Sequence, residues 1–353
     1  MPPSNPKQTT GTSGSAPKIL VVGPSWVGDM MMAQALFIAL KQQQPGAIID
    51  VLALGWCRPI LARMPQVNRT IPMPLGHGKF DLKGRKALGV SLRDEHYDQA
   101  IVLPNSWKSA LIPWFANIPL RTGWKGEARY FLLNDLRKLN KTRLPMMVQR
   151  YVALAYPRAS AEREALDHCP LPALQVDPRQ LPALTEKFNL SRQPMLAICP
   201  GAEFGPAKQW PVGYYTDLIR QFIDKGWQVA IMGSPSDTET GEDIASSVDS
   251  DSIINLCGKT SLEEAIDILS MAEKVVSNDS GLMHIASALN RPLIALYGPT
   301  SSEFTPPLSR DARILSVKVD CGPCFQRQCP HGHQKCMTQL GVDTVVNELD
   351  AIG

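Results

Sequence analysis

The sequence contains no apolar run long enough to cross a membrane. None of its hydrophobic stretches approaches the roughly 18 consecutive apolar residues of a spanning helix. The first seventeen residues, MPPSNPKQTTGTSGSAP, have almost no apolar content and lack the hydrophobic region of a secretory signal. We therefore expect residues 1–17 to form a disordered tail, and the protein to be cytoplasmic or peripheral on the cytoplasmic face of a membrane.

A large excess of charge of one sign is also absent. Basic residues number 36 and acidic residues 33, so the formal net charge is only +3 and no nucleic-acid partner is implied. The 44% hydrophobic and 20% charged content is typical of a globular protein, and 353 residues suffice for two domains.

Two common nucleotide-binding motifs are missing from the first glycine-rich turn. The apolar run Lys18–Val22 is followed by GPSWVGDMMMAQ, residues 23–34, a strand-to-helix turn of the kind that binds anions. A P-loop would place Lys and Ser/Thr after the second glycine, whereas Asp29 follows Gly28 here. The spacing Gly23-x4-Gly28 is not G-x-G-x-x-G either, which disfavours an NAD-dependent oxidoreductase.

Apolar strands alternate with amphipathic helices in both halves of the chain. This pattern predicts an α/β fold of two doubly wound parallel-sheet domains, with ligands bound at the carboxyl ends of the strands. We expect domains at 18–175 and 176–340, and a C-terminal helix within 341–353 that packs back on the body. The expected strands are 18–23, 48–54, 99–104, 195–199, 228–233, 252–256, 274–277 and 292–297.

Two loops of the second half could bind a diphosphate. Lys208 follows strand 195–199 in PGAEFGPAKQWP, although a lone lysine in a turn is more often a solvated one. Ser280 and Gly281 open the helix after strand 274–277, where Asn278 or Asp279 could simply be its cap. His284 lies one turn further, and together with Lys208 it favours a two-sided grip on phosphate. The turn 297–300 could close the same pocket.

Residues 121–150 contain eight basic residues opposed by only two acidic ones. A solvated face is the default for such a run, but the excess suggests contact with an anionic partner. Cysteines are bunched near the C-terminus, at Cys321, Cys324, Cys329 and Cys336. In a reducing compartment this bunch points away from disulfides, and it could bind a structural zinc ion. A catalytic metal is disfavoured because we expect the cluster to lie outside the loops that face the cleft.

Taken together, GPSWVGDMMMAQ, PGAEFGPAKQWP and NDSGLMHIASAL with the following YGPT resemble the bacterial heptosyltransferase family (glycosyltransferase family 9). The similarity runs from about Lys18 to the C-terminus and includes TGWKGEARYFLLND and the terminal cysteines. It implies a GT-B fold, in which two Rossmann-like domains face a central cleft and the C-terminal one binds the donor. It also implies that no metal or other cofactor is required.

The resemblance further implies an inverting transfer of L-glycero-D-manno-heptose from ADP-heptose to the lipopolysaccharide inner core. For the branch that is most similar, the acceptor is the first heptose on Kdo-modified lipid A, at the cytoplasmic face of the inner membrane. Three alternatives remain open from the residues alone: a first-heptose transferase, a GT-B transferase of another nucleotide sugar, and a non-catalytic nucleotide- or polyanion-binding protein.

The family's functional positions map onto this chain residue by residue. Asp29 matches the proposed catalytic base, which we expect the helix dipole to keep ionised and weakly basic. Lys208 would stabilise the departing ADP while the acceptor attacks in line. The implied donor-binding residues are Ala202, Glu203, Lys208, Glu239, Thr260, Asp279, Ser280, Gly281 and His284. The expected acceptor-binding residues are Gly28, Arg121, Lys125 and Arg129.

Overall fold

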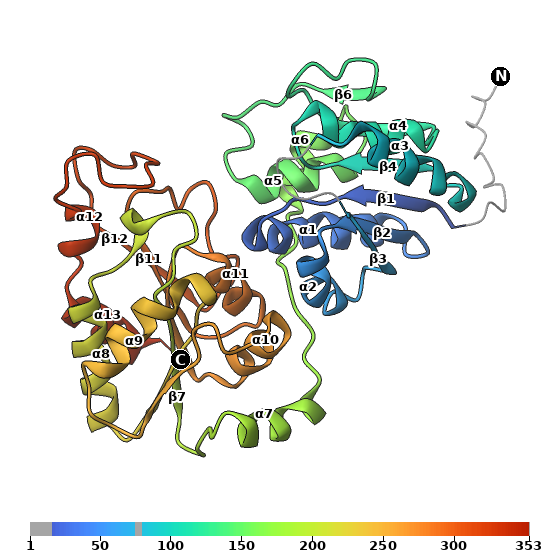
Figure 1. Ribbon diagram of the computed structural model, residues 1–353. Coiled ribbons are helices and arrows are strands. Elements are labelled where there is room, and N and C mark those ends of the chain that lie inside the picture. Colours follow the sequence, from blue (N-terminus) through green and yellow to red (C-terminus); the bar gives the residue numbers. More distant parts are fainter. Residues whose placement is uncertain (1–15, 75–79, 353) are drawn as a thin grey trace, which may run out of the picture.

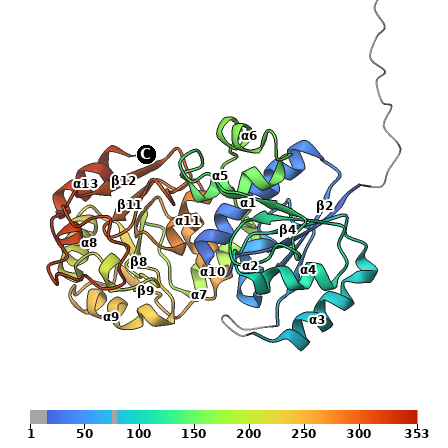
Figure 2. The same ribbon diagram turned by 90° about the horizontal axis from the view of Figure 1, so that it is seen from above.

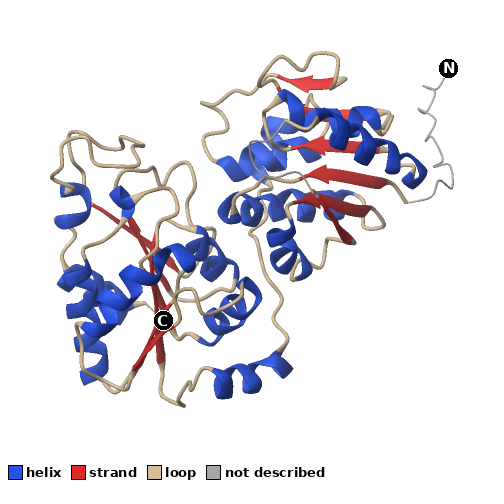
Figure 3. Ribbon diagram, in the orientation of Figure 1, coloured by secondary structure: helices blue, strands red, loops and turns tan. Residues whose placement is uncertain are grey.

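The computed structural model describes residues 16–74 and 80–352, which form two lobes joined near the middle of the chain (Figure 1). Most of the predicted tail, residues 1–15, therefore lies outside the described residues. Each lobe is built on a six-stranded parallel sheet. Helices cover both faces of each sheet (Figure 3). The prediction of two doubly wound α/β domains is confirmed.

The N-terminal sheet has the strand order β3-β2-β1-β4-β5-β6. Its central strand β1 is buried from Ile19 to Val22, as expected for a strand covered on both faces. The strands are β1 (Lys18–Val22), β2 (Ile48–Ala53), β3 (Arg69–Pro72), β4 (Gln99–Val102), β5 (Leu120–Trp124) and β6 (Asp135–Arg137). The helices are α1 (Val27–Gln43), α2 (Arg58–Ala62), α3 (Leu82–Ser91), α4 (Leu111–Phe115), α5 (Met147–Val152) and α6 (Ala161–Asp167).

The C-terminal sheet repeats this order as β12-β11-β10-β7-β8-β9. In both sheets the strand order reverses beside the first strand, and the loops at this point are where such folds bind ligands. The strands are β7 (Met195–Cys199), β8 (Gln228–Ile231), β9 (Ile253–Asn255), β10 (Lys274–Asn278), β11 (Leu293–Tyr297) and β12 (Ala312–Ser316). The helices are α7 (Leu181–Lys187), α8 (Val212–Asp224), α9 (Thr238–Ser246), α10 (Leu262–Met271), α11 (Gly281–Ala288), α12 (Lys335–Thr338) and α13 (Val342–Ala351).

Four strands, β3, β5, β6 and β12, were not predicted from the sequence. They are short and only partly buried, as in RTIP and DLR, so they lack the apolar run that identifies a central strand. The C-terminal helix α13 buries Val345, Val346 and Leu349 and packs against α8 and β11. Within residues 16–74 and 80–352, no helix is long and apolar enough to cross a membrane.

The two lobes meet through α1 and α11, which lie side by side in both views (Figures 1 and 2). Buried apolar residues of α1, α10 and α11 belong to one continuous core, so the contact is a packed one. A buried ion pair between Arg63 and Asp267 joins the lobes a short distance away, with 2.6 Å between Nη2 and Oδ2. The contact fixes the start of α1 against the start of α11.

Candidate active site

The first turns of α1 and α11 touch at two glycines. A Cβ atom built on Gly28 would lie 2.7 Å from Cδ2 of His284, and one built on Gly281 would lie 2.8 Å from Cβ of Val27. Real side chains do not approach this closely, so both positions need glycine for the lobes to meet. Gly28, which we expected at the acceptor site, thus lies against the imidazole of a residue expected at the donor site.

Asp29 lies next to this contact, in the first turn of α1. No hydrogen bond or ion pair reaches its carboxylate from the described residues. Burial raises the pKa of Asp29 to about 6. The pKa of Tyr151 on α5 is also raised, first by its own burial and then by the nearby negative charge of Asp29. Our expectation of a weakly basic Asp29 was therefore wrong, because loss of solvent outweighs the helix dipole here. A carboxylate with a pKa near neutrality is well suited to accept a proton.

Lys208 and Asp279 form the central ion pair of the C-terminal lobe. The Lys208 ammonium donates to Oδ2 of Asp279 at 2.6 Å and to its carbonyl oxygen at 3.1 Å. Thr300 donates to the same Oδ2 at 2.6 Å, so the turn 297–300 does close on this site. Both charged side chains are nearly buried, with 12% and 7% of their areas exposed. The sequence predicted these residues as separate phosphate and sugar contacts but not their pairing.

The start of α11 supplies the other predicted phosphate contacts. Ser280 caps the helix by accepting the N–H of Met283 at 3.4 Å, and its hydroxyl lies 3.2 Å from that of Ser277. His284 is buried, and burial lowers its pKa to about 4. The imidazole is therefore neutral at physiological pH and retains a single N–H donor.

The remaining donor-site residues lie on the loops after β7 and β9 and, for Glu239, in the first turn of α9 after β8. Ala202 and Thr260 are half-buried, whereas Glu203 and Glu239 are exposed. Ser236 donates weakly to Glu203, at 3.5 Å. These loops share the carboxyl edge of the sheet with Lys208.

Sequence analysis missed Asp237, which is buried between these loops. Its carboxylate accepts the backbone N–H and the hydroxyl of Ser234, at 2.8 and 2.7 Å. A Cβ atom on Gly201 would lie 2.5 Å from Oδ2 of Asp237, so the loop after β7 packs directly against this acid and needs glycine there. The signal that could have identified it is the capping spacing Ser234-x2-Asp237.

The basic stretch 121–150 divides into paired arginines and exposed lysines. Arg129 is 1% exposed and donates to backbone carbonyls, including Pro104 at 2.6 Å and Trp124 at 2.5 Å. Arg121, near the amino end of β5, donates to the carbonyls of Leu132 and Ile118. Both guanidinium groups are occupied by backbone carbonyl oxygens, so their expected acceptor contacts find no support in this geometry.

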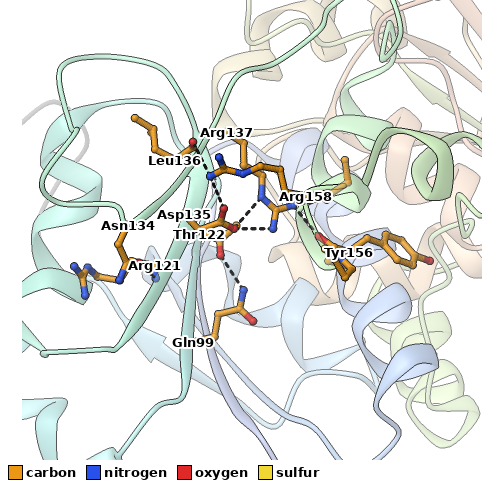
Figure 4. A network of polar contacts seen from close by, with 12 residues as sticks. Gln99, Arg121, Thr122, Asn134, Asp135, Leu136, Arg137, Tyr156 and Arg158 are labelled. Carbon is orange, nitrogen blue, oxygen red and sulfur yellow. Dashed lines mark hydrogen bonds and ion pairs between the residues drawn. The ribbon is translucent and has the colours of Figure 1, made fainter. Parts of the chain in front are cut away.

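Figure 4 shows that a third arginine of this stretch, Arg137, is also bound within the protein and is not available to an acceptor. Arg137 donates to Oδ2 of Asp135 at 2.7 Å and to the carbonyl of Tyr156 at 2.8 Å, while Arg158 binds the other carboxylate oxygen. The exposed cations without an ion pair are instead Lys125, Lys138 and Lys141, which follow β5 and β6 at the carboxyl edge, whereas the exposed Arg143 pairs with Glu162. None of the three makes an ion pair within the described part of the chain.

The cysteine loop, residues 321–336, lies beside the donor loops. Its four cysteines are free thiols and line one cavity together with His333, Ala207 and Pro299. The N–H of Gln334 donates to Sγ of Cys329 at 3.4 Å, which helps to lower the pKa of that thiol. In the described residues no three His, Cys, Asp or Glu side chains form a group that could hold a metal ion, so the expected zinc site finds no support. The cluster is thus a separate segment, but it packs directly against the loops that carry Ala207 and Pro299, a contact that the sequence did not predict.

Comparisons with known proteins agree with this geometry. The family model for glycosyltransferase family 9 (heptosyltransferase) matches residues 85–335. The chain is 49% identical over 341 residues to lipopolysaccharide heptosyltransferase 2 of Escherichia coli, covering 95% of this chain and 98% of the relative. It is 54% identical over 309 residues to lipooligosaccharide heptosyltransferase 2 of Haemophilus influenzae, covering 85% and 88%.

Among solved structures, that of E. coli ADP-heptose lipopolysaccharide heptosyltransferase II superposes with a TM-score of 0.85 at 48% identity, covering 95% of this chain and 98% of that one. The E. coli heptosyltransferase WaaC with ADP has a TM-score of 0.70 at 22% identity, covering 94% and 99%, and shares the fold. The expected GT-B arrangement is confirmed. The chain belongs to glycosyltransferase family 9, the heptosyltransferases.

Proposed function

We propose that the protein transfers L-glycero-D-manno-heptose from ADP-heptose to the first heptose of the lipopolysaccharide inner core, with inversion at the transferred sugar. The observation that carries the proposal is the meeting of two unlike sites at the contact between α1 and α11. One is Asp29, an unpaired carboxylate with a raised pKa, and the other is the Lys208–Asp279 pair with the start of α11. The high identity to relatives named heptosyltransferase 2 supports the same substrates.

In this mechanism Asp29 accepts the proton of the acceptor hydroxyl as its oxygen attacks the anomeric carbon of the donor. The bond from that carbon to the β-phosphate oxygen breaks, and ADP leaves with the bonding electrons. Lys208, the Ser280 hydroxyl and the free N–H groups at the start of α11 stabilise the charge on the departing diphosphate. An ammonium group has three N–H donors, so Lys208 can bind phosphate while it remains attached to Asp279.

We propose that no metal ion is needed, because Lys208, the Ser280 hydroxyl and the N–H groups at the start of α11 donate hydrogen bonds to the departing ADP and so stabilise its charge, as a divalent cation does elsewhere. Full turnover in the presence of a chelator is the expected result. A loss of turnover that added Mg²⁺ or Mn²⁺ restores would contradict it.

For the acceptor, we propose that Gly28, Lys125, Lys138 and Lys141 face the anionic inner core. The three lysines are exposed at the edge that carries Asp29, where carboxylates and phosphates of the acceptor would reach them. We do not extend this proposal to Arg121 and Arg129, whose guanidinium groups are bound to backbone carbonyls.

We further propose that this edge binds peripherally to the cytoplasmic face of the inner membrane. Exposed aromatic side chains lie on the loops after β1, β2, β4 and β5, interspersed with the lysines, and this mixture suits an anionic lipid surface. They are Trp26, Trp56, Trp107, Tyr130 and Phe131, between 40% and 91% exposed. Co-sedimentation with vesicles containing anionic lipid, and not with neutral vesicles, is the expected result.

Mass spectrometry of a truncated acceptor after incubation with ADP-heptose tests the function directly. Heptosyl-Kdo2-lipid A should gain one heptose, whereas Kdo2-lipid A without heptose should remain unchanged. Transfer to the latter alone would make the protein a first-heptose transferase. A product with UDP- or GDP-sugars but not with ADP-heptose would overturn the donor, and binding of ADP-heptose without any product would overturn the enzyme.

A further inference from the structure

The cysteine loop is in direct backbone contact with the loop that carries Lys208. The N–H of Ala207 donates to the carbonyl oxygen of Arg327 at 3.1 Å. A Cβ atom on Gly205 would lie 2.5 Å from the same oxygen, and Gly205 has a φ of +153°. Position 205 therefore needs glycine so that residue 327 can approach, and the two loops are held in a fixed relation.

The side chain of Arg327 reaches the aromatic ring beside Lys208. Its guanidinium lies 5.7 Å from the centroid of the Phe204 ring, and the Lys208 ammonium lies 5.0 Å from the same centroid. Cations at these distances are attracted to the face of an aromatic ring. Phe204 therefore has two cations within 6 Å of its ring, one from the donor loop and one from the cysteine loop.

These two cations differ in their partners. Lys208 is paired with Asp279, so that pair contributes no net charge. The side chain of Arg327 is exposed and has no ion pair or hydrogen bond with the described residues, so its positive charge is not compensated by a salt bridge. A nucleoside diphosphate sugar brings two phosphate charges, more than the Lys208–Asp279 pair can neutralise.

We infer that Arg327 is a second diphosphate-binding residue of the donor site, and that the cysteine loop positions it there. A guanidinium can bind two phosphate oxygens at once, which makes it suited to this contact. The inference rests on the proposed function of the Lys208 loop as the donor site. It adds a residue that lies more than 100 positions further along the chain than Lys208.

Calorimetric titration of the full-length protein with ADP and with adenosine tests the inference. Arg327→Ala should weaken ADP binding by about tenfold or more, because a charge-assisted hydrogen bond is lost. Arg327→Lys should restore part of the affinity, and adenosine binding should not change in either variant. Arg310→Ala is the matched control, since Arg310 is exposed and precedes β12 at the opposite edge of the sheet.

Unchanged ADP affinity in Arg327→Ala would overturn the inference. Equal weakening of ADP and adenosine would also overturn it, since that result means a structural role for the loop. Lys208→Ala separates this failure from failure of the donor site itself. If Lys208→Ala weakens ADP binding and Arg327→Ala does not, only the role of Arg327 is wrong. If neither does, the proposed donor site is wrong.

Discussion

The candidate site lies between the carboxyl edges of the two sheets, and these edges differ in whether their charged side chains are paired. At the C-terminal edge the central charged groups are already paired, with Lys208 and Thr300 both bound to Asp279, and the unpaired Arg327 lies beside them. At the N-terminal edge Asp29 has no polar partner in the described chain, and Lys125, Lys138 and Lys141 make no ion pair there. The same strand order thus supports one edge that is pre-organised and one whose charges await a ligand.

This difference follows from what each edge must do. Stabilising a leaving group requires donors that are fixed before the reaction, since their reorganisation would add to the barrier. Accepting a proton instead requires a carboxylate that no other donor occupies and whose pKa lies near the working pH. The comparison predicts that substitutions on the two edges will have different kinetic effects.

Asp29→Asn should produce the largest effect. The amide keeps the shape of the side chain but cannot accept the proton, so we expect turnover to fall by about 10³-fold, within the range for loss of a general base. Binding of ADP, measured by calorimetry, should stay within twofold of the unsubstituted protein. Turnover above a tenth of normal would show that Asp29 is not the base. The unpaired carboxylate would then no longer explain how the N-terminal edge differs from the C-terminal one.

Lys208→Ala tests the pre-organised edge. Loss of its charge-assisted hydrogen bonds should weaken ADP-heptose binding by about 30-fold, and it leaves the Asp279 carboxylate next to the diphosphate. Lys225→Ala is the control, because Lys225 pairs with Asp350 and follows α8 at the opposite edge. Equal donor affinity in both variants would remove Lys208 from the site.

Replacing Lys125, Lys138 and Lys141 together with alanine tests the edge with unpaired charges. The KM for the lipopolysaccharide acceptor should rise by about tenfold at low salt, and the difference should shrink as salt screens the charges. The KM for ADP-heptose should not change. If the donor KM rises instead, the lysines serve the other substrate.

The sequence predicted the parts of the molecule that depend on local pattern. Long apolar strands such as 195–199 and the glycine-rich turns identified both sheets and the loops at their carboxyl edges. Within the site, Lys208 and Asp279 were found separately, but their pairing brings together residues from two strand ends and no local pattern encodes it. The contact of Gly28 with His284 is of the same kind, because it exists only once the lobes meet.

Charge runs were the least reliable guide. Arg129 and Lys125 stand four residues apart in one basic stretch, yet Arg129 is buried among carbonyls and Lys125 is exposed. A guanidinium can satisfy several buried carbonyls and an ammonium group on a flexible stem tends to stay in water, so residue type carried more information than charge. The raised pKa of Asp29 was missed for a related reason, since the burial that raises it comes from tertiary packing and cannot be read from the first turn of α1.

Near neutral pH, the smallest expected effect is the pH dependence that Asp29 imposes. With a folded-state pKa of about 6, raised by burial above its usual 3.8, the catalytic form is the ionised one. The value of kcat/KM should therefore be near its plateau at pH 8, fall to about half at pH 6 and decrease about tenfold for each further pH unit below 6.

The free energy of unfolding should depend on pH in the opposite direction to activity. Between pH 4 and 6 the folded state binds the proton of Asp29 more tightly than the unfolded state does, so ionisation of Asp29 destabilises the folded state as pH rises through this window. Asp29→Asn should consequently raise the melting temperature at pH 8 but not at pH 4. A melting temperature that the substitution lowers at pH 8 would mean that the ionised carboxylate is stabilised in the folded state.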